Sequence, residues 1–346
     1  MKRMIFITAL LAMLLFAFSA CAGSVGHMEK QPDTQGTKQV QQESKGRMPA
    51  GGIKVGPIIH RDGAMGSLKP DKELQAILDE VQDKYRLLTF TDPDTGFKMQ
   101  YELFVPENYN RAERYPLVMF IPDARAAGRT PAFSLNVGWG GVIWATAEEQ
   151  AKHPSFVLVP IFTEVIVDDD FNTSPQIETA VKLIHNLCDN YSIDTNRLYT
   201  TGQSMGGMTS FHLNVTQPDL FAASLFVGSQ WNNELLQVLE KKKFFYIVSA
   251  GDSKASAGQA GLMAVFAEDG VAYTHEQWSA QEARAVQNAC VQAMLAKSLN
   301  ANFITFIKGT TFIGEEPRGG EHLTSFDYAY KLEAVRDWLF AQSKEK

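Results

Sequence analysis

Three residues, a serine, an aspartate and a histidine, occur in an order and in contexts that suit nucleophilic catalysis. Ser204 is the centre of the pentapeptide Gly-Gln-Ser-Met-Gly, residues 202–206. Asp252 comes directly after an apolar run that ends in glycine, and His322 follows a Gly-Gly-Glu sequence much later. A serine hydroxyl is a weak nucleophile at neutral pH, so an imidazole must take its proton and a carboxylate must orient that imidazole. The pattern predicts acyl transfer with Ser204 as nucleophile, Asp252 as acid and His322 as base.

Each of these residues is expected at the end of a regular element. A strand-like run, Arg197–Thr201, precedes the serine, and an apolar helical stretch starts near Gly207. A serine in such a strand-to-helix turn is held on a strained backbone, and flanking glycines let strand and helix approach closely. The run Phe244–Ala250 indicates the strand before the aspartate, and the histidine is expected in a loop just before the last helix. Because the five-residue motif says little alone, these flanking elements carry the assignment.

Other acids and histidines remain as alternatives. Asp252 could instead cap an ordinary turn, because Gly-Asp after a strand is also a common turn sequence. Asp269 is the rival acid, but it ends a helix-like run rather than a strand. Among the histidines after the serine, His275 is expected to be solvated and His212 to pack on its helix. Four more precede the serine and break the hydrolase order of serine, acid and histidine: His27, His60, His153 and His185.

Strand-like and helix-like segments alternate along the rest of the chain. Unbroken apolar runs, as in Pro116–Ile121 and Phe156–Phe162, are typical of strands buried on both faces. Strands that alternate with helices form a mostly parallel sheet with helices on both faces, so the predicted fold class is α/β. The other segments are helix-like at Pro70–Leu87, Val142–Lys152, Ile177–Tyr191, Gly258–Glu268 and Gln281–Leu299, and strand-like at Lys98–Val105, Ala222–Gly228 and Asn302–Lys308.

The composition excludes several classes of protein. The chain has 346 residues, of which 45% are hydrophobic, and this is enough for a large core. Its net charge is −7 with scattered lysines and arginines, whereas nucleic-acid binding needs a clustered basic face. No cysteine and histidine cluster has zinc-site spacing, and neither common glycine-rich phosphate loop occurs. The sequence predicts no nucleic-acid partner, no metal and no other cofactor, and no protein partner is evident.

The N-terminus has the features of an export signal. Lys2 and Arg3 precede an apolar run, Met4–Phe18, that is short for a membrane span. The sequence Phe-Ser-Ala-Cys that ends at Cys21 resembles the bacterial lipoprotein cleavage box, in which the cysteine becomes the first mature residue and carries the lipid. Phenylalanine stands where leucine is usual, so an ordinary cleaved signal is the alternative. We expect an exported cell-envelope lipoprotein that meets the membrane only through this anchor, or otherwise a secreted or periplasmic protein.

The chain is expected to fall into four parts. Residues 1–21 are the signal peptide. Residues 22–52, rich in glutamine, glycine, lysine and serine, are a disordered polar tether. Residues 53–87 are an N-terminal arm with a helix, and residues 88–346 are the catalytic domain.

Two cysteines remain besides Cys21. In an oxidising compartment, Cys188 and Cys290 could form one disulfide. Both lie on helix-like segments with apolar neighbours, where buried free cysteines are common. We favour unpaired core thiols, and whether the two pair stays open.

Five segments carry a family resemblance: Tyr101–Pro106, Tyr115–Val118, Phe156–Pro160, Tyr191–Gly207 and Gln217–Ala223. They resemble the secreted α/β-hydrolase esterases that are related to polyhydroxybutyrate depolymerases, feruloyl esterases and the catalytic domain of prolyl oligopeptidases. The resemblance covers roughly residues 88–342 and is most specific around the serine. It implies an α/β-hydrolase fold and carboxylic ester hydrolysis, and by matching position it makes Ser204 the nucleophile, Asp252 the acid and His322 the base.

One departure from this family concerns the oxyanion hole. The hole needs two backbone N–H donors, one from the residue after the nucleophile, Met205, and one from the loop after the first buried strand. Members usually have His-Gly in that loop, where this chain has Pro122-Asp123. Proline has no N–H, so the loop donor is expected at Ala124. The aspartate would oppose a developing oxyanion unless its carboxylate points away or pairs with Arg125 or Arg129.

Three residues are candidates for the substrate pocket. Trp139 and Trp231 follow strand or loop segments at the functional end of such a sheet, where loops build pockets. A packing role is equally expected for both tryptophans. Gln203, directly before the nucleophile, is the third candidate.

The predicted function is that of a serine hydrolase that cleaves carboxylic esters, on extracellular esterified substrates. A prolyl-oligopeptidase-like peptidase has the same triad but usually adds a large gating domain. An acyltransferase differs only in whether water or an alcohol resolves the acyl-enzyme. A surface lipoprotein that binds glycans or esters with a weakened site is the alternative from another class, and Pro122-Asp123 is the feature that favours it.

Overall fold

The computed structural model describes residues 70–344 of the chain. The predicted signal peptide, the lipidation site Cys21 and the tether at 22–52 lie outside the described residues, as does the first part, 53–69, of the predicted arm. Within the described part of the chain, no helix is both long enough and apolar enough to cross a membrane.

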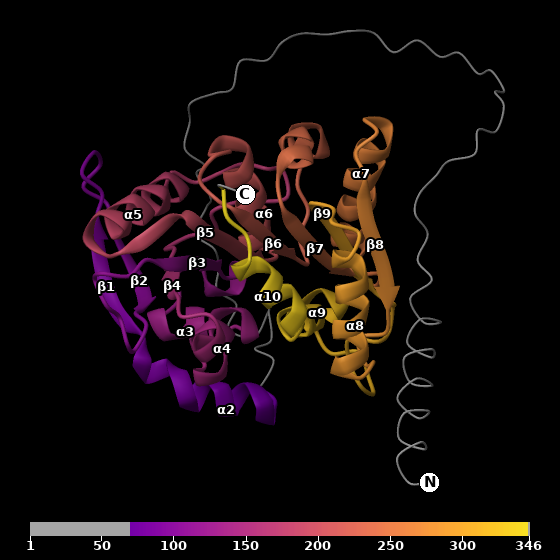
Figure 1. Cartoon of the computed structure of the whole chain (residues 1–346), viewed down its shortest axis with the longest axis horizontal. Coiled ribbons are helices and arrows are strands. Elements are labelled where there is room, and N and C mark those ends of the chain that lie inside the picture. Colours follow the sequence, from indigo (N-terminus) through magenta and orange to yellow (C-terminus); the bar gives the residue numbers. More distant parts are fainter. Residues whose placement is uncertain (1–69, 345–346) are drawn as a thin grey trace, which may run out of the picture.

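One sheet forms the centre of the described chain (Figure 1). Its nine strands are β1 (Arg86–Thr91), β2 (Lys98–Phe104), β3 (Tyr115–Ile121), β4 (Phe156–Pro160), β5 (Ile193–Gln203), β6 (Ala223–Val227), β7 (Phe244–Ser249), β8 (Tyr273–Trp278) and β9 (Ala301–Phe306). Their spatial order is β1-β2-β4-β3-β5-β6-β7-β9-β8. β2 pairs antiparallel with β1 and β4, and all other neighbours pair parallel. The carboxyl ends of β3, β5, β6 and β7 therefore meet at one edge, where α/β proteins place their sites.

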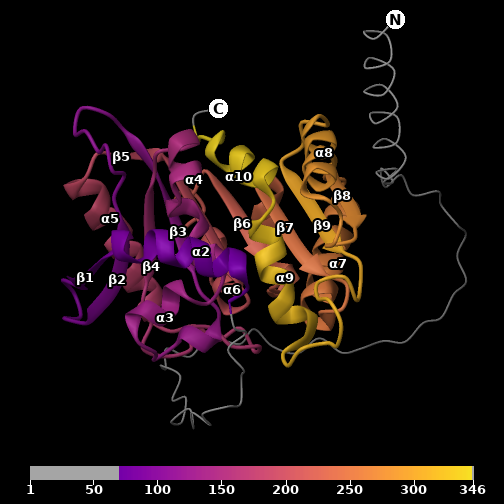
Figure 2. The ribbon, with the colours of Figure 1, turned by 90° about the horizontal axis from the view of Figure 1, so that it is seen from below.

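Helices cover both faces of this sheet, as predicted (Figures 1 and 2). One face carries α5 (Gln176–Asn190), α6 (Met205–Thr216) and α7 (Ser253–Glu268). The other face carries α2 (Lys72–Val81), α8 (Arg284–Leu295), α9 (Gly320–Tyr330) and α10 (Glu333–Phe340), and the short helices α3 (Pro131–Leu135) and α4 (Ala147–Lys152) lie beside them. Short 3-10 helices lie at Gln82–Lys84, Ala124–Ala126, Trp139–Gly141, Ile143–Ala145 and Asn233–Lys241.

Strand β3 shows why the apolar runs predict this architecture. All seven of its residues are buried. Val118 and Phe120 pack with the helices of one face, whereas Leu117, Met119 and Ile121 pack with those of the other. A strand covered on both faces needs apolar residues at every position, and the prediction of buried strands is confirmed here.

Helix α2 belongs to the same core. Leu74, Leu78 and Val81 are buried and belong to the same apolar core as residues of α8, α9 and α10. The described part of the predicted arm therefore packs on the rest of the chain. The boundary expected between residues 87 and 88 falls within β1.

Two predicted helices differ from the structure. The helix expected over Pro70–Leu87 is α2, which ends at Val81, and the chain then turns and enters β1. The helix expected over Val142–Lys152 is a short 3-10 turn followed by α4. There the side chain of Thr146 accepts a hydrogen bond from the N–H of Glu149, which caps and so starts the helix.

The edge strand β8 is missing from the sequence prediction. It pairs with β9, which places β9 between β7 and β8. His275 lies on β8, where its Nε2 is 2.9 Å from the Thr305 hydroxyl, and burial lowers the pKa of its imidazole. His275 is half-buried, so the expectation that it is solvated holds only in part.

The structure answers the question of the cysteine pair. Cys188, on α5, is a free thiol, and burial with the nearby charge of Asp189 raises its pKa to about 11. Cys188 and Cys290 therefore do not form a disulfide with each other. Cys290 is buried on α8, in the core of the opposite face.

Candidate active site

Ser204, His322 and Asp252 form one hydrogen-bonded chain. The hydroxyl of Ser204 is 2.9 Å from His322 Nε2, and His322 Nδ1 is 2.5 Å from Asp252 Oδ2. These residues come from the ends of β5 and β7 and from the start of α9. An imidazole between a hydroxyl and a carboxylate is the arrangement that activates a serine, since the carboxylate fixes the ring while the ring takes the proton.

The backbone at Ser204 is strained in the way that a nucleophile turn requires. Its φ is 52° and its ψ is −121°, outside the common regions for a residue with a side chain. A Cβ atom at Gly202 would lie 2.3 Å from the carbonyl carbon of Gly206, and one at Gly206 would lie 1.9 Å from the carbonyl oxygen of Ile121. Both positions therefore need glycine if β5, α6 and the end of β3 are to pack this closely.

Asp252 has both of the roles that its sequence context allows. Its Oδ1 accepts a hydrogen bond from the N–H of Ala255 and so caps α7, while its Oδ2 faces His322. The side chain is only 7% exposed. The rival acid, Asp269, is at the opposite end of the same helix, about 25 Å away along its axis.

His322 lies in the first turn of α9, so the expectation that it lies in a loop is wrong. The neighbouring residue Glu321 anchors this turn. Its buried carboxylate accepts from the N–H of Gly309 at 2.8 Å and from the hydroxyl of Ser249. The imidazole itself packs edge-on against Phe326, with ring centroids 5.1 Å apart. Sequence reasoning missed Glu321, although a glutamate beside a candidate histidine is a signal that could have found it.

The two expected oxyanion donors begin helical segments. Met205 is the first residue of α6, and Ala124 is the first residue of the 3-10 helix after β3. The first N–H groups of a helix have no partner within it and lie at its positive end, so they are free to bind an anion. The close contact of Gly206 with Ile121 and Pro122 brings these two segments together.

The carboxylate of Asp123 is held by two side chains. It is 2% exposed, and it accepts from Arg125 Nε at 2.7 Å, from Arg125 Nη2 at 2.9 Å and from Gln203 Nε2 at 2.8 Å. Burial alone would lower the pKa of Arg125, but the hydrogen bonds and the charge of Asp123 raise it above its ordinary value. The negative charge that could oppose an oxyanion is therefore paired, as one of the sequence alternatives allowed.

None of the three pocket candidates lies among the residues that line the cleft at Ser204. Gln203 is fully buried against Asp123. Trp139 is buried and its ring faces the ammonium of Lys331, 4.6 Å away. Trp231 packs against Phe171 with ring centroids 5.1 Å apart. For both tryptophans the structure gives the packing arrangement, which was the alternative to the pocket.

The cleft at Ser204 has a volume of about 420 Å³, and most of the residues that line it carry polar side chains. Lys254 Nζ lies 2.5 Å from Asp169 Oδ2 on its wall, and Gln230 donates to the same carboxylate at 2.9 Å. Glu316 and Glu321 add two more carboxyl groups. Sequence reasoning missed these residues because they follow no motif and come from loops and helix ends far apart in the chain.

Another titratable group, Asp327, lies farther along the helix that carries His322. Asp327, on α9, accepts a hydrogen bond from the backbone N–H of Trp139 at 2.8 Å. Burial raises the pKa of its carboxyl to about 6. It borders a smaller hollow of about 240 Å³ that Arg125 and Lys331 also line.

Comparison with known proteins gives the fold a name. No protein-family model matches the sequence, and no curated protein matches it. A solved structure described as a thermostable esterase matches with a TM-score of 0.60 and 25% identity over 76% of this chain, which spans 64% of that one. The feruloyl esterase module from Clostridium thermocellum and a ferulic acid esterase each match with a TM-score of 0.50, at 12% and 10% identity.

The coverage of these two is broad. The matches span 79% and 75% of this chain, and 94% and 98% of theirs. Their low identities make them measures of fold alone. The α/β-hydrolase fold that the resemblance predicts is confirmed, and the solved structures that this chain resembles are esterases.

Proposed function

We propose that this protein is a serine hydrolase that cleaves carboxylic esters through an acyl-enzyme. The observation that carries the proposal is the hydrogen-bonded chain of Ser204, His322 and Asp252, with the serine on a strained turn at the head of α6. The esterase neighbours support ester hydrolysis as the class of reaction. They leave the substrate open.

In the proposed first step, His322 Nε2 takes the proton of Ser204 while the serine oxygen attacks the ester carbonyl carbon. The carbonyl oxygen becomes negative, and the N–H groups of Met205 and Ala124 stabilise it. When the intermediate collapses, the bond to the leaving alcohol breaks and His322 returns the proton to that alcohol. The acyl group remains on the serine as an ester.

In the second step the same imidazole takes a proton from water, and the resulting hydroxide attacks the acyl-enzyme. The oxyanion forms again in the same hole, and its collapse frees the acid and returns the proton to Ser204. Asp252 keeps the ring oriented and stabilises its charged form in both steps. Water as the second acceptor distinguishes this proposal from an acyltransferase.

The pairing of Asp123 with Arg125 bears on the alternative of a weakened binding site. That alternative rests on an unpaired carboxylate beside the oxyanion. Since the carboxylate is paired with a guanidinium and also accepts from Gln203, its charge gives no reason to expect a weakened site. Hydrolysis is the function that the geometry supports best.

The polar wall of the cleft favours polar substrates. Carboxyl, amide and ammonium groups there can bind hydroxyl groups of an ester's acyl or alcohol part. We propose that the N-terminal sequence directs the protein to export and to a lipid anchor at Cys21. Its substrates would then be esters outside the cell. This part of the proposal rests on the sequence alone.

Covalent labelling tests the assignment of the nucleophile. A fluorophosphonate reacts with a serine that an imidazole activates, and we expect one adduct per chain, mapped to Ser204 by peptide mass spectrometry. A His322→Gln variant should label far more slowly, while His185→Gln, on the exposed side of α5, should label like the natural protein. An adduct on another serine, or none on the folded protein, would contradict the proposal.

A further inference from the structure

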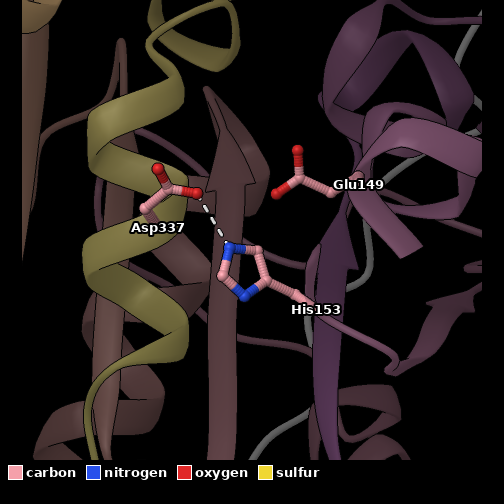
Figure 3. A group of neighbouring side chains, drawn as sticks. All are labelled: Glu149, His153 and Asp337. Carbon is pink, nitrogen blue, oxygen red and sulfur yellow. Dashed lines mark hydrogen bonds and ion pairs between the residues drawn. The ribbon is translucent and has the colours of Figure 1, made fainter. Parts of the chain in front are cut away.

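A cluster of metal-ligand side chains joins α4 to α10 (Figure 3). Glu149 and His153 come from α4 and its C-terminal end, four residues apart, and Asp337 comes from α10. One atom of each, a carboxylate oxygen or a ring nitrogen, lies within 4.8 Å of the corresponding atoms of the other two. His153 Nε2 is already 2.8 Å from Asp337 Oδ1.

One oxygen in this cluster has no hydrogen-bond partner in the described structure. Glu149 is 1% exposed, and its Oε1 is buried without any partner, whereas its Oε2 accepts from Arg336 Nε at 2.9 Å. An unpartnered buried carboxylate oxygen is costly, and an ion or water that binds it is the usual explanation in a native protein. Figure 3 shows an oxygen of Glu149 pointing toward the space between His153 and Asp337.

Neighbouring groups hold two of the three side chains in place. Arg336 binds one oxygen of Glu149, and a second nitrogen of the same guanidinium donates to the carbonyl of Tyr330, so the carboxylate is oriented and its other oxygen is left for a ligand. His153 stacks on Phe340, with ring centroids 4.6 Å apart and planes 15° from parallel. Such supporting contacts are typical of metal ligands, which must be fixed before the ion arrives.

We propose that Glu149, His153 and Asp337 bind a divalent transition-metal ion such as Zn²⁺. One imidazole and two carboxylates suit zinc better than Mg²⁺, which prefers oxygen ligands and its own waters. With metal–ligand bonds of about 2.0–2.2 Å, two ligands of a tetrahedral ion are about 3.4 Å apart, so His153 and Asp337 need to separate by only about 0.6 Å. The ion replaces their hydrogen bond, binds the free oxygen of Glu149 and takes water as its fourth ligand.

The position of this site assigns it a structural role. His153 lies just before β4 begins, whereas Ser204 follows the end of β5, and β3 runs parallel to both strands. The metal site therefore lies near the amino ends of the parallel strands, whereas the cleft lies at their carboxyl ends. An ion here cross-links α10, near the C-terminus, to α4 and stabilises the folded chain by mass action.

Calorimetric titration of the metal-free full-length protein with Zn²⁺, followed by thermal unfolding with and without the ion, tests this proposal. We expect saturation by one ion that Asp337→Asn and His153→Gln abolish or weaken at least tenfold, together with a rise in melting temperature that both variants lose. Asp337 is 43% exposed, so its variant should fold even if that of His153 does not. The matched control His185→Gln should still bind the ion. The proposal is overturned if the folded Asp337→Asn protein binds Zn²⁺ and is stabilised by it as the natural protein is. It is also overturned if the natural protein binds no Zn²⁺.

Discussion

The side-chain amide of Gln203 donates a hydrogen bond to the carboxylate of Asp123 at 2.8 Å. Gln203 is the last residue of β5, directly before the nucleophile, and Asp123 directly precedes the proposed oxyanion donor Ala124. This one contact therefore joins the two segments whose N–H groups must point at the same oxygen. Arg125 also donates two hydrogen bonds to the same carboxylate, so the contact between Gln203 and Asp123 includes a buried, paired charge.

Loss of the hydrogen bond between Gln203 and Asp123 should change kcat more than KM. Gln203→Met keeps the length of the side chain but removes the donor, so the loop of Ala124 loses its fixed position relative to Met205. We expect kcat to fall by about tenfold to a hundredfold with a small change in KM, since misplaced catalytic groups cost this much. Steady-state kinetics measures the split between the two constants.

The control for this variant is Gln237→Met, at an exposed glutamine on the Asn233–Lys241 helix. It should leave both constants unchanged. If the folded Gln203→Met enzyme keeps its kcat, the contact with Asp123 does not position the oxyanion hole.

The two roles of Asp252 can be separated by one substitution. Asn at this position still accepts from the N–H of Ala255 and caps α7, but it has no charge to stabilise the imidazolium of His322. Asp252→Asn should therefore lower kcat by about 10³- to 10⁴-fold, as loss of the acid does in the serine-protease triad, while the melting temperature changes little. Asp269→Asn, at the other end of the same helix, should change neither. An equal loss of activity in both variants would contradict the assignment of Asp252.

Asp327 should make the stability of the protein depend on pH. Burial raises the pKa of its carboxyl to about 6 from an ordinary value of 3.8, so between these pH values the folded state holds a proton that the unfolded state has lost. Its contribution to the free energy of unfolding is therefore largest below pH 4, falls as the pH rises through 6 and is constant above that. A shift of about two pKa units corresponds to about 3 kcal/mol.

Asp327→Asn removes this titration and keeps an acceptor for the N–H of Trp139. Compared with the natural protein, the variant should gain up to about 3 kcal/mol in the free energy of unfolding between pH 4 and pH 7. Urea unfolding at several pH values measures the difference. Asp189→Asn, on the exposed side of α5, should give a curve parallel to the natural one. A parallel curve for Asp327→Asn as well would show that its carboxyl is not destabilised by burial.

Much of the fold follows from local patterns in the sequence. The apolar run of β3 and the strand, turn and helix around Ser204 are local, and all are found where the sequence predicts them. The order of the strands is not local. Strand β8 has polar residues at its four central positions, Thr274 to Gln277, and so lacks the polar-apolar alternation that predicts a strand. Its pairing with β9 joins segments that are apart in the chain, so its partner was not evident either.

The site was predictable to the same extent. Ser204 and Asp252 each come after a strand, as expected, and His322 comes last in the chain, within the first turn of α9 rather than in a loop. The structure brings the three side chains together. Gln203 was a candidate for the pocket, but its side chain is buried and donates to Asp123, a residue 80 positions earlier in the chain. Contacts between residues so far apart in the chain cannot be inferred from motif spacing or from hydrophobic periodicity.

The cleft shows the same limit. Asp169 lies in a loop and Lys254 lies in the first turn of α7, and the two come together on the cleft wall only through the packing of this loop against the helix end. Trp139 and Trp231 were sensible candidates by their positions after strands, but apolar area draws large aromatic side chains into the core. The conformation of the loops, rather than the order of the strands, determines which residues line the cleft.

The most direct test of the central claim is the hydrolysis of p-nitrophenyl esters, from acetate to octanoate, by the full-length protein and its Ser204→Ala variant. We predict release of p-nitrophenol by the natural protein and by the control Ser256→Ala, a serine on α7 whose hydroxyl donates to the carbonyl of Ser253. For Ser204→Ala we predict a loss of at least 10³-fold in kcat, as expected when a triad nucleophile is removed. The profile over chain length would measure the acyl pocket. Undiminished hydrolysis by folded Ser204→Ala protein would contradict the account.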